Sequence, residues 1–168
     1  LICFSSPFDE SAVDFLETLN VPAYKIASFE NTDLPLIKKV ISTKKPIIIS
    51  TGIAELKDIE LAIDTCKKVG NDQITILKCT SAYPALAEDA NLLTIPDIAK
   101  RFNVVSGLSD HTLGIEAPVV AVILGAKVIE KHFILNKEIG GPDAHFSLDE
   151  TEFTEMVEAV RRAEEMMG

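Results

Sequence analysis

The chain has 168 residues, of which 47% are hydrophobic and 25% charged, and its formal net charge is −10 at pH 7. This length and composition predict one globular, soluble domain with a substantial core and argue against a disordered chain. The acidic balance argues against general nucleic-acid binding, which requires a basic face, and no apolar stretch reaches the roughly 18 residues that a membrane span needs.

The cysteine content points to a reducing compartment. Cys3, Cys66 and Cys79 are odd in number and lack the CxxC spacing of redox and metal motifs. No charged and apolar leader of the secretory type is recognisable. We therefore expect free thiols and a cytoplasmic location.

Six short apolar runs predict β-strands, and a segment with helical periodicity follows each of them. The predicted strands are residues 1–4, 23–28, 46–51, 74–79, 103–108 and 127–133. The predicted helices are residues 11–19, 34–42, 55–69, 93–102, 116–126 and 148–167. The last of these is the clearest helix, because Asp149 or Thr151 can cap its start ahead of an apolar stripe.

This alternation predicts a parallel sheet, because parallel strands need a crossover and a helix is the usual one. An open doubly wound sheet and a (β/α)₈ TIM barrel both satisfy the pattern. A complete barrel takes about 250 residues and eight units, whereas this chain opens at Leu1 inside an apolar run. We therefore expect an α/β fold in which residues 1–168 form a truncated TIM barrel of six βα units, strands 3 to 8.

Polar side chains stand at the end of every predicted strand. They are Ser5 and Ser6, Ser28 and Glu30, Ser50 and Thr51, Thr80, Ser81 and Tyr83, Ser109, Asp110 and His111, and finally His132. In a β/α barrel these ends converge on one mouth, where the active sites of this fold are found. Helix caps account for some of the hydroxyl groups, but they explain neither the two histidines nor Lys25.

His111, in the motif GLSDHT, and His132 end consecutive predicted strands. Two imidazoles with a nearby carboxylate suit Mn²⁺, Fe²⁺ or Zn²⁺, although each histidine can also simply hydrogen-bond locally. Asp110 can ligate the ion or orient His111. Strand alternation predicts that Glu130 faces the barrel interior with His132, while Lys131 points away and packs among the helices.

Lys25 lies within an otherwise apolar strand, where an unpaired ammonium is costly. Two readings are open: an ion pair with a carboxylate such as Glu130, or a bound phosphate or carboxylate of a substrate. In the second reading a cup of serine hydroxyls surrounds the anion, from Ser6, Ser28, Ser50, Ser81 and Ser109. Neither a P-loop nor a GxGxxG motif is present.

The segment GGPD at residues 140–143 precedes the last helix. Its glycines permit a tight turn that can present Asp143 over the mouth, and an ordinary turn explains the same residues equally well. His145 has no role that the pattern identifies.

These motifs together resemble the sialic acid synthase family, enzymes that condense phosphoenolpyruvate with an amino-sugar aldehyde. The matching segments occur in order through almost the whole chain. They are SSPF (5–8), AYKIASFE (23–30), PIIISTG (46–52), KCTSAYP (78–84), GLSDHT (107–112), VIEKHF (128–133) and GGPD (140–143). The ASFE and KCTS versions are most like the pseudaminic acid synthase branch.

The resemblance implies a role for each site residue. His111 and His132 would bind a divalent metal, typically Mn²⁺. Lys25, Ser6, Ser28, Ser50, Ser81 and Ser109 would surround phosphoenolpyruvate, with Tyr83 close by, and Glu30 and Asp143 would face the sugar. Ser81 stands where the neuraminate branch usually has asparagine.

The resemblance also implies that two leading βα units and a C-terminal antifreeze-like domain lie outside this chain, so the isolated chain is expected to be inactive. The full-length protein would be a domain-swapped homodimer. Its reaction would join phosphoenolpyruvate to 2,4-diacetamido-2,4,6-trideoxy-L-altrose, with Lys25 and Glu30 as catalytic candidates, giving pseudaminic acid and phosphate by C–O cleavage.

Three alternatives stay open. The first is another sugar, in an N-acetylneuraminate or legionaminate synthase. The second is a pyruvate aldolase that forms a Schiff base at Lys25. The third is a non-catalytic sugar-binding domain in which the polar strand ends merely cap helices.

Overall fold

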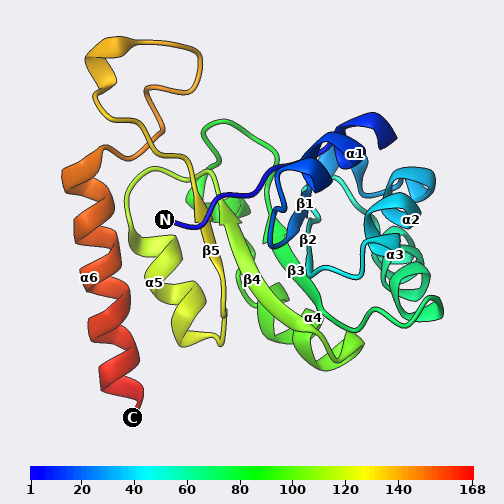
Figure 1. The fold of residues 1–168 in the computed structure, drawn as a ribbon. Helices are drawn as coiled ribbons and strands as arrows, with labels where there is room; N and C mark the ends of the chain where they lie inside the picture. Colours follow the sequence, from blue (N-terminus) through cyan, green and yellow to red (C-terminus); the bar gives the residue numbers. More distant parts are fainter.

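The computed structural model describes all residues from 1 to 168 and shows strands and helices alternating along the chain (Figure 1). The first half contains α1 (Glu10–Thr18), β1 (Tyr24–Ile26), α2 (Leu34–Ser42), β2 (Ile47–Ser50), α3 (Leu56–Lys68) and β3 (Ile74–Cys79). The second half contains α4 (Thr94–Phe102), β4 (Val105–Asp110), α5 (Glu116–Ile123), β5 (Ile129–Lys131) and α6 (Glu150–Met167). Short 3₁₀ turns occur at Ser28–Glu30, Ala87–Asp89 and Lys137–Ile139.

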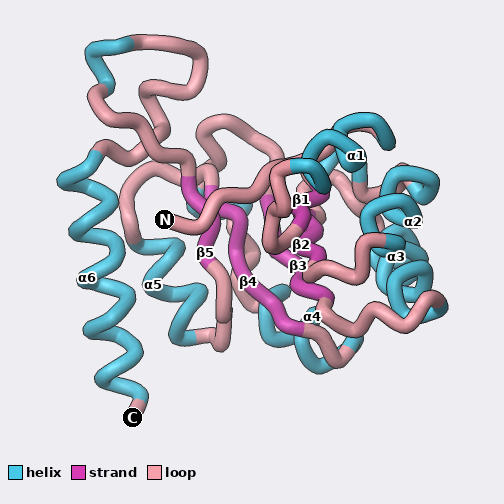
Figure 2. Tube along the Cα trace, viewed as in Figure 1, coloured by secondary structure: helices cyan, strands magenta, loops and turns pink.

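The five strands form one parallel sheet in the order β1-β2-β3-β4-β5. The sheet curls into a half-barrel, with α1 to α3 beside one end of it and α5 and α6 beside the other (Figure 2). Because all strands run in the same direction, their carboxyl ends meet at one edge of the sheet. The arrangement confirms the predicted parallel α/β architecture.

The prediction of six strands is wrong, because residues 1–4 form no strand. Leu1 and Ile2 are exposed to solvent, and only Ser5 makes an isolated parallel bridge to Tyr24. The backbone N–H of Lys25 donates to the carbonyl of Ser5 at 3.2 Å. The leading segment thus lies beside β1 but makes too few ladder bonds to count as a strand, and five βα units remain.

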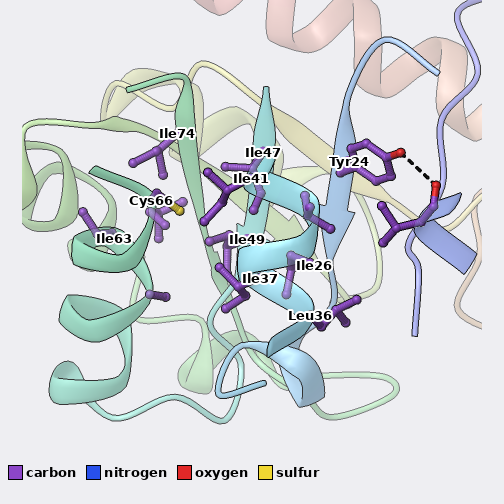
Figure 3. Packing of buried hydrophobic residues seen from close by; sticks show 14 of the residues in the cluster. Tyr24, Ile26, Leu36, Ile37, Ile41, Ile47, Ile49, Ile63, Cys66 and Ile74 are labelled. Atoms are coloured by element: carbon purple, nitrogen blue, oxygen red, sulfur yellow. Dashed lines mark hydrogen bonds between the residues drawn. The ribbon is translucent and has the colours of Figure 1, made fainter. Parts of the chain in front are cut away.

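The main core lies between the sheet and the helices. Tyr24 and Ile26 of β1 and Ile47 and Ile49 of β2 alternate with residues of the opposite face, and all four are at most 1% exposed. They meet apolar side chains of α2, including Ile37 (Figure 3). Burial of each such aliphatic side chain away from water contributes roughly 1.5–3 kcal/mol to the free energy of folding. Because side chains alternate along a strand, the residues between these core positions, such as Lys25, point to the opposite, concave face of the sheet.

The helices begin and end close to their predicted bounds, and α2 spans residues 34–42 as predicted. Asp149 forms the expected cap of α6: its side chain accepts from the backbone N–H of Glu152, whose own carboxylate accepts from the backbone N–H of Asp149. This reciprocal pair fixes the start of the helix. No helix is both long and apolar enough to cross a membrane.

Candidate active site

A pocket with a volume of about 250 Å³ opens at the carboxyl ends of the strands. The structure brings together in it eight of the residues that sequence reasoning selected: Ser6, Lys25, Ser28, Ser50, Tyr83, Ser109, His111 and His132. Ala27, Cys79 and Glu130 complete the lining. Every strand of the sheet contributes to this pocket, either from its last residues or from those directly after it.

Lys25 lies on the concave face of β1 and is only 8% exposed. Its ammonium donates to the hydroxyl of Ser50 at 2.8 Å and to the carbonyl of Ile26 at 3.1 Å. Glu130 Oε1 is 3.6 Å away, so the ion pair that was one of the two readings of Lys25 is present. Burial lowers the pKa of Lys25, against the opposing effect of the Glu130 charge. The site therefore holds a desolvated cation with a weak protein counter-ion.

The serines form a hydroxyl layer above the strand ends. Ser28 accepts from the backbone N–H of Gly52 at 3.0 Å. A Cβ added at Gly52 would lie 2.1 Å from Ser81 Oγ and 2.9 Å from Ser28 Oγ, so only glycine lets the backbone approach so closely. Ser81 does not line the pocket, but its buried hydroxyl has no hydrogen-bond partner. The turn after β2 therefore carries a polar cup beside Lys25.

His111 and His132 stand next to each other, with their ring centres 5.2 Å apart. The Nδ1–H of His111 donates to the carbonyl of Thr80 at 2.8 Å, which leaves Nε2 as its free nitrogen. His132 Nδ1 is 3.5 Å from Asp143 Oδ2. Burial lowers the pKa of His132, and the neighbouring His111 lowers it further. Both rings are therefore held where their nitrogens can share one ligand.

Two aromatic side chains pack on the histidines. The ring of Tyr83 is centred 4.1 Å from that of His111, and the ring of Phe146 is centred 4.9 Å from that of His132. Phe146 is buried and was missed by sequence reasoning, because it follows the polar GGPD turn rather than a strand. The two aromatic rings restrict the orientation of the imidazoles.

Cys79 is a second residue that sequence reasoning missed. It ends β3 opposite Ser109, lines the pocket and places its sulfur 3.9 Å from His111 Nδ1. Burial alone would raise the pKa of its thiol, but hydrogen bonds with His111, Ser28 and Ser109 lower it. The alternation of side chains along β3 could have identified it, because Cys79 and Leu77 point to the face of the sheet opposite the one on which Ile76 joins the main core.

Glu30 and Asp143 do not line the pocket itself. Glu30 ends the 3₁₀ turn after β1, and its Oε2 is buried without a hydrogen-bond partner. Asp143 approaches the pocket from the loop before α6, with a side chain that is 58% exposed. His145 is exposed and contacts Phe146 rather than the pocket. The loop thus places Asp143 beside His132, which agrees with one of the two interpretations that the turn pattern left open.

Asp110 and Lys131 contact each other on the face of the sheet opposite the pocket. Lys131 Nζ is 2.5 Å from Asp110 Oδ2, and both side chains are almost fully buried. The prediction that Lys131 packs among the helices is therefore incomplete, because its buried charge requires this carboxylate. Glu130 faces the pocket as predicted, where its Oε1 accepts from Ser109 at 2.7 Å.

His111 and His132 are two pocket side chains that could ligate a divalent transition ion. His111 engages a backbone carbonyl through Nδ1, which is how metal-binding histidines are usually oriented. No group of three or more His, Cys, Asp or Glu side chains could hold a metal ion. An ion held by the two imidazoles alone would have fewer protein ligands than the three of a typical catalytic zinc site, and the remaining positions would be open to water or substrate oxygen.

Comparison with known proteins places the chain in a group of sugar-acid synthases. The NeuB family matches residues 1–168. Pseudaminic acid synthase of Helicobacter pylori is 52% identical over 98% of the chain and 48% of its own length. N,N'-diacetyllegionaminic acid synthase of Legionella pneumophila is 45% identical over 98% of the chain and 47% of its own length.

The same relationship holds for a solved structure. Spore coat polysaccharide biosynthesis protein SpsE of Bacillus subtilis superposes with a TM-score of 0.97 and 43% identity, over 99% of this chain and 47% of its own. The chain spans about half the length of the curated relatives that it matches.

Proposed function

Because this chain belongs to the NeuB family, we propose that the whole protein condenses phosphoenolpyruvate with an amino-sugar aldehyde to give a nonulosonic acid and phosphate. One observation carries the proposal: the ammonium of Lys25 and the imidazoles of His111 and His132 line a single pocket of about 250 Å³. An anion subsite and a cation subsite side by side are what this reaction requires.

The sugar that we propose is 2,4-diacetamido-2,4,6-trideoxy-L-altrose, which would give pseudaminic acid. The support is the 52% identity with pseudaminic acid synthase, against 45% with the legionaminic acid synthase. A legionaminate or N-acetylneuraminate product is the second candidate, which the 45% identity with the legionaminic acid synthase supports.

In the proposed reaction, C3 of phosphoenolpyruvate bonds to the aldehyde carbon, whose oxygen becomes a hydroxyl group. Water adds at C2, and the C2–O bond then breaks as phosphate leaves. Mn²⁺ held by His111 and His132 would supply Lewis-acid polarisation of the aldehyde oxygen.

The protein side chains would bind and orient the reactants. Lys25 would bind the phosphate or carboxylate of phosphoenolpyruvate, while Ser28 and Ser50 donate hydrogen bonds to it. Holding both reactants in line supplies much of the acceleration by proximity. Glu30 and Asp143 would face the sugar, and the buried Oε2 of Glu30 lacks a donor, so it is our candidate for accepting a proton.

The same proposal covers the architecture of the whole protein. The curled five-stranded sheet would be part of a complete (β/α)₈ TIM barrel, followed by an antifreeze-like domain in a domain-swapped homodimer. All three cysteines are free, which fits the cytoplasm as its compartment.

The test uses the whole protein with phosphoenolpyruvate, Mn²⁺ and a panel of aldoses, with phosphate release as the readout. We expect turnover of the trideoxy-altrose, and ¹⁸O placed in the bridging position of phosphoenolpyruvate should appear in phosphate, since C–O cleavage keeps it there. Turnover of N-acetylmannosamine instead would contradict the pseudaminate assignment.

Variants of the histidines separate the synthase from its rivals. His111→Ala and His132→Ala should abolish Mn²⁺-dependent phosphate release, whereas His145→Ala, which removes an exposed imidazole outside the pocket, should leave it unchanged. A non-catalytic domain would tolerate all three changes. Trapping of Lys25 with pyruvate and borohydride would favour the aldolase.

A further inference from the structure

An ion pair directly behind the pocket is unlike all the others in the structure. Asp110 and Lys131 have side chains only 2% and 1% exposed, with Oδ2 and Nζ 2.5 Å apart. Each of the remaining ion pairs includes at least one well-exposed side chain. Burying two charges so deeply costs desolvation free energy, which is offset only if the ion pair has good geometry and the remaining donors and acceptors of both side chains are hydrogen-bonded.

The remaining hydrogen bonds of the pair fix the turn that carries His111. Asp110 Oδ1 accepts from both the backbone N–H of Thr112 at 2.9 Å and its hydroxyl at 2.8 Å. Lys131 Nζ also donates to the carbonyl of Thr112. His111 lies between Asp110 and Thr112, so its backbone is held at both ends by groups bonded to the ion pair.

The sequence places the pair between the proposed functional residues. Asp110 separates Ser109 from His111 on β4, and Lys131 stands directly before His132 on β5. Side chains alternate along a strand, so the ion pair must face away from the pocket when its neighbours face into it. The Cα register pairs Asp110 with Lys131, so the ion pair directly joins the last residues of β4 and β5.

β5 needs such a link because its backbone pairing is weak. The strand has only three residues, and three paired positions fix its register against β4 (Figure 1). A slip of one residue would turn every side chain of a strand to the opposite face. His132 would then leave the pocket.

We propose that Asp110 and Lys131 are positioning residues, which lock β5 onto β4 in one register and so hold the rings of His111 and His132 at the spacing that a shared metal ion requires. The part of this inference that concerns Mn²⁺ rests on the proposed function. Neither side chain touches the pocket, so both act through the histidines that follow them.

The first test measures Mn²⁺ binding by titration calorimetry and electron paramagnetic resonance in the whole protein. Asp110→Asn keeps the oxygen that bonds Thr112 but replaces Oδ2, the acceptor of Lys131, with an uncharged NH₂ group that cannot accept a hydrogen bond. We expect the folded Asp110→Asn and Lys131→Met variants to bind Mn²⁺ about 10- to 100-fold more weakly, as other changes behind metal ligands do. Asp97→Asn is the control, because it breaks the exposed pair with Arg101 on α4.

The double variant Asp110→Asn with Lys131→Met separates positioning from simple destabilisation. It removes both buried charges, so its thermal stability should exceed that of either single variant. Its Mn²⁺ affinity should nevertheless stay about 10-fold or more below that of the unmodified protein, because the link between the strands is absent. Native affinity in the double variant, or in folded single variants, would overturn the proposal.

A second readout needs no metal. In the metal-free protein, the imidazole ring resonances of His111 and His132 should shift in Asp110→Asn and Lys131→Met, and stay in place in Asp97→Asn. If the unmodified protein bound no Mn²⁺ while these rings still responded, the proposed metal would be wrong and the positioning role would stand. Unchanged rings in the folded variants would refute that role.

Discussion

Replacing Lys25 by methionine is the sharpest test of the anion subsite. Methionine keeps the length and apolar stem of the side chain but removes the ammonium, which is 2.8 Å from Ser50 Oγ and 3.6 Å from Glu130 Oε1. A hydrogen bond to a charged group contributes about 1.5–3 kcal/mol. At about 1.4 kcal/mol per tenfold change, Lys25→Met should lower kcat/KM for phosphoenolpyruvate about 10- to 150-fold.

The stability of the same variant should change little. Glu130 has a side chain that is 42% exposed and keeps the hydroxyl of Ser109 as a donor, so losing Lys25 leaves no buried unpaired carboxylate. We expect the free energy of unfolding to stay within about 1 kcal/mol of the original, since a partly exposed pair contributes little. Steady-state kinetics and urea denaturation measure the two effects separately.

The control for this experiment is Lys45→Met. Lys45 also forms an ion pair, 2.6 Å from Glu17, but lies outside the pocket. The Lys45→Met variant should leave KM for phosphoenolpyruvate unchanged. If Lys25→Met left KM and kcat intact, or acted only by unfolding the protein, the ammonium would be a structural cation and the anion subsite would have to lie elsewhere.

Three further outcomes follow from the same geometry. Burial lowers the pKa of Lys25, so its side chain loses its positive charge at a lower pH than an ordinary lysine does. KM for phosphoenolpyruvate should therefore rise at alkaline pH, and this rise should be absent from the pH profile of Lys25→Met. Gly52→Ala would place a Cβ 2.1 Å from Ser81 Oγ, so denaturation should show a loss of about 1–3 kcal/mol, and KM should rise as well. Burial raises the pKa of the Cys66 thiol to about 11, so alkylation at pH 8 followed by mass spectrometry should find exposed Cys3 modified and Cys66 untouched until the protein is unfolded.

Much of the site could be predicted because the fold converts sequence position into spatial position. In parallel βα units the residue after each strand comes to the same edge, so hydroxyl, imidazole and ammonium groups found there had to be neighbours. The alternation of side chains along a strand was enough to place three of these residues on the pocket face, because each lies next to a core residue of its own strand: Lys25, Ser50 and Ser109. The pocket that joins them follows from these two rules.

The parts that could not be predicted depend on contacts between strands. The run beginning at Leu1 is apolar enough for a strand, but a strand also needs a ladder of backbone bonds, and here only Ser5 reaches β1. Alternation along β3 could have placed Cys79 on the pocket face, but the register that puts it opposite Ser109 is a contact between strands. Lys131 has its partner Asp110 on another strand, and no sequence pattern states which residues face each other across two strands.

The two ion pairs of this region have opposite properties. On the pocket side, Lys25 and Glu130 are 3.6 Å apart, and the carboxylate is 42% exposed and holds a second donor in Ser109. Under the proposed function, the substrate anion would replace Glu130 at the ammonium, because the displaced carboxylate would keep its access to solvent and its hydrogen bond from Ser109.

On the helix-facing side, Asp110 and Lys131 are 2.5 Å apart with no access to solvent, and removing either one strands a buried charge. Ser109 and Asp110 are adjacent in β4, and so are Glu130 and Lys131 in β5, so strand alternation alone assigns each acid to its face. Glu130 of β5 thus pairs with Lys25 of β1 on the pocket face, whereas the pair behind it joins β5 to β4. The proposed exchange of Glu130 for a substrate anion would therefore leave the link between β4 and β5 intact.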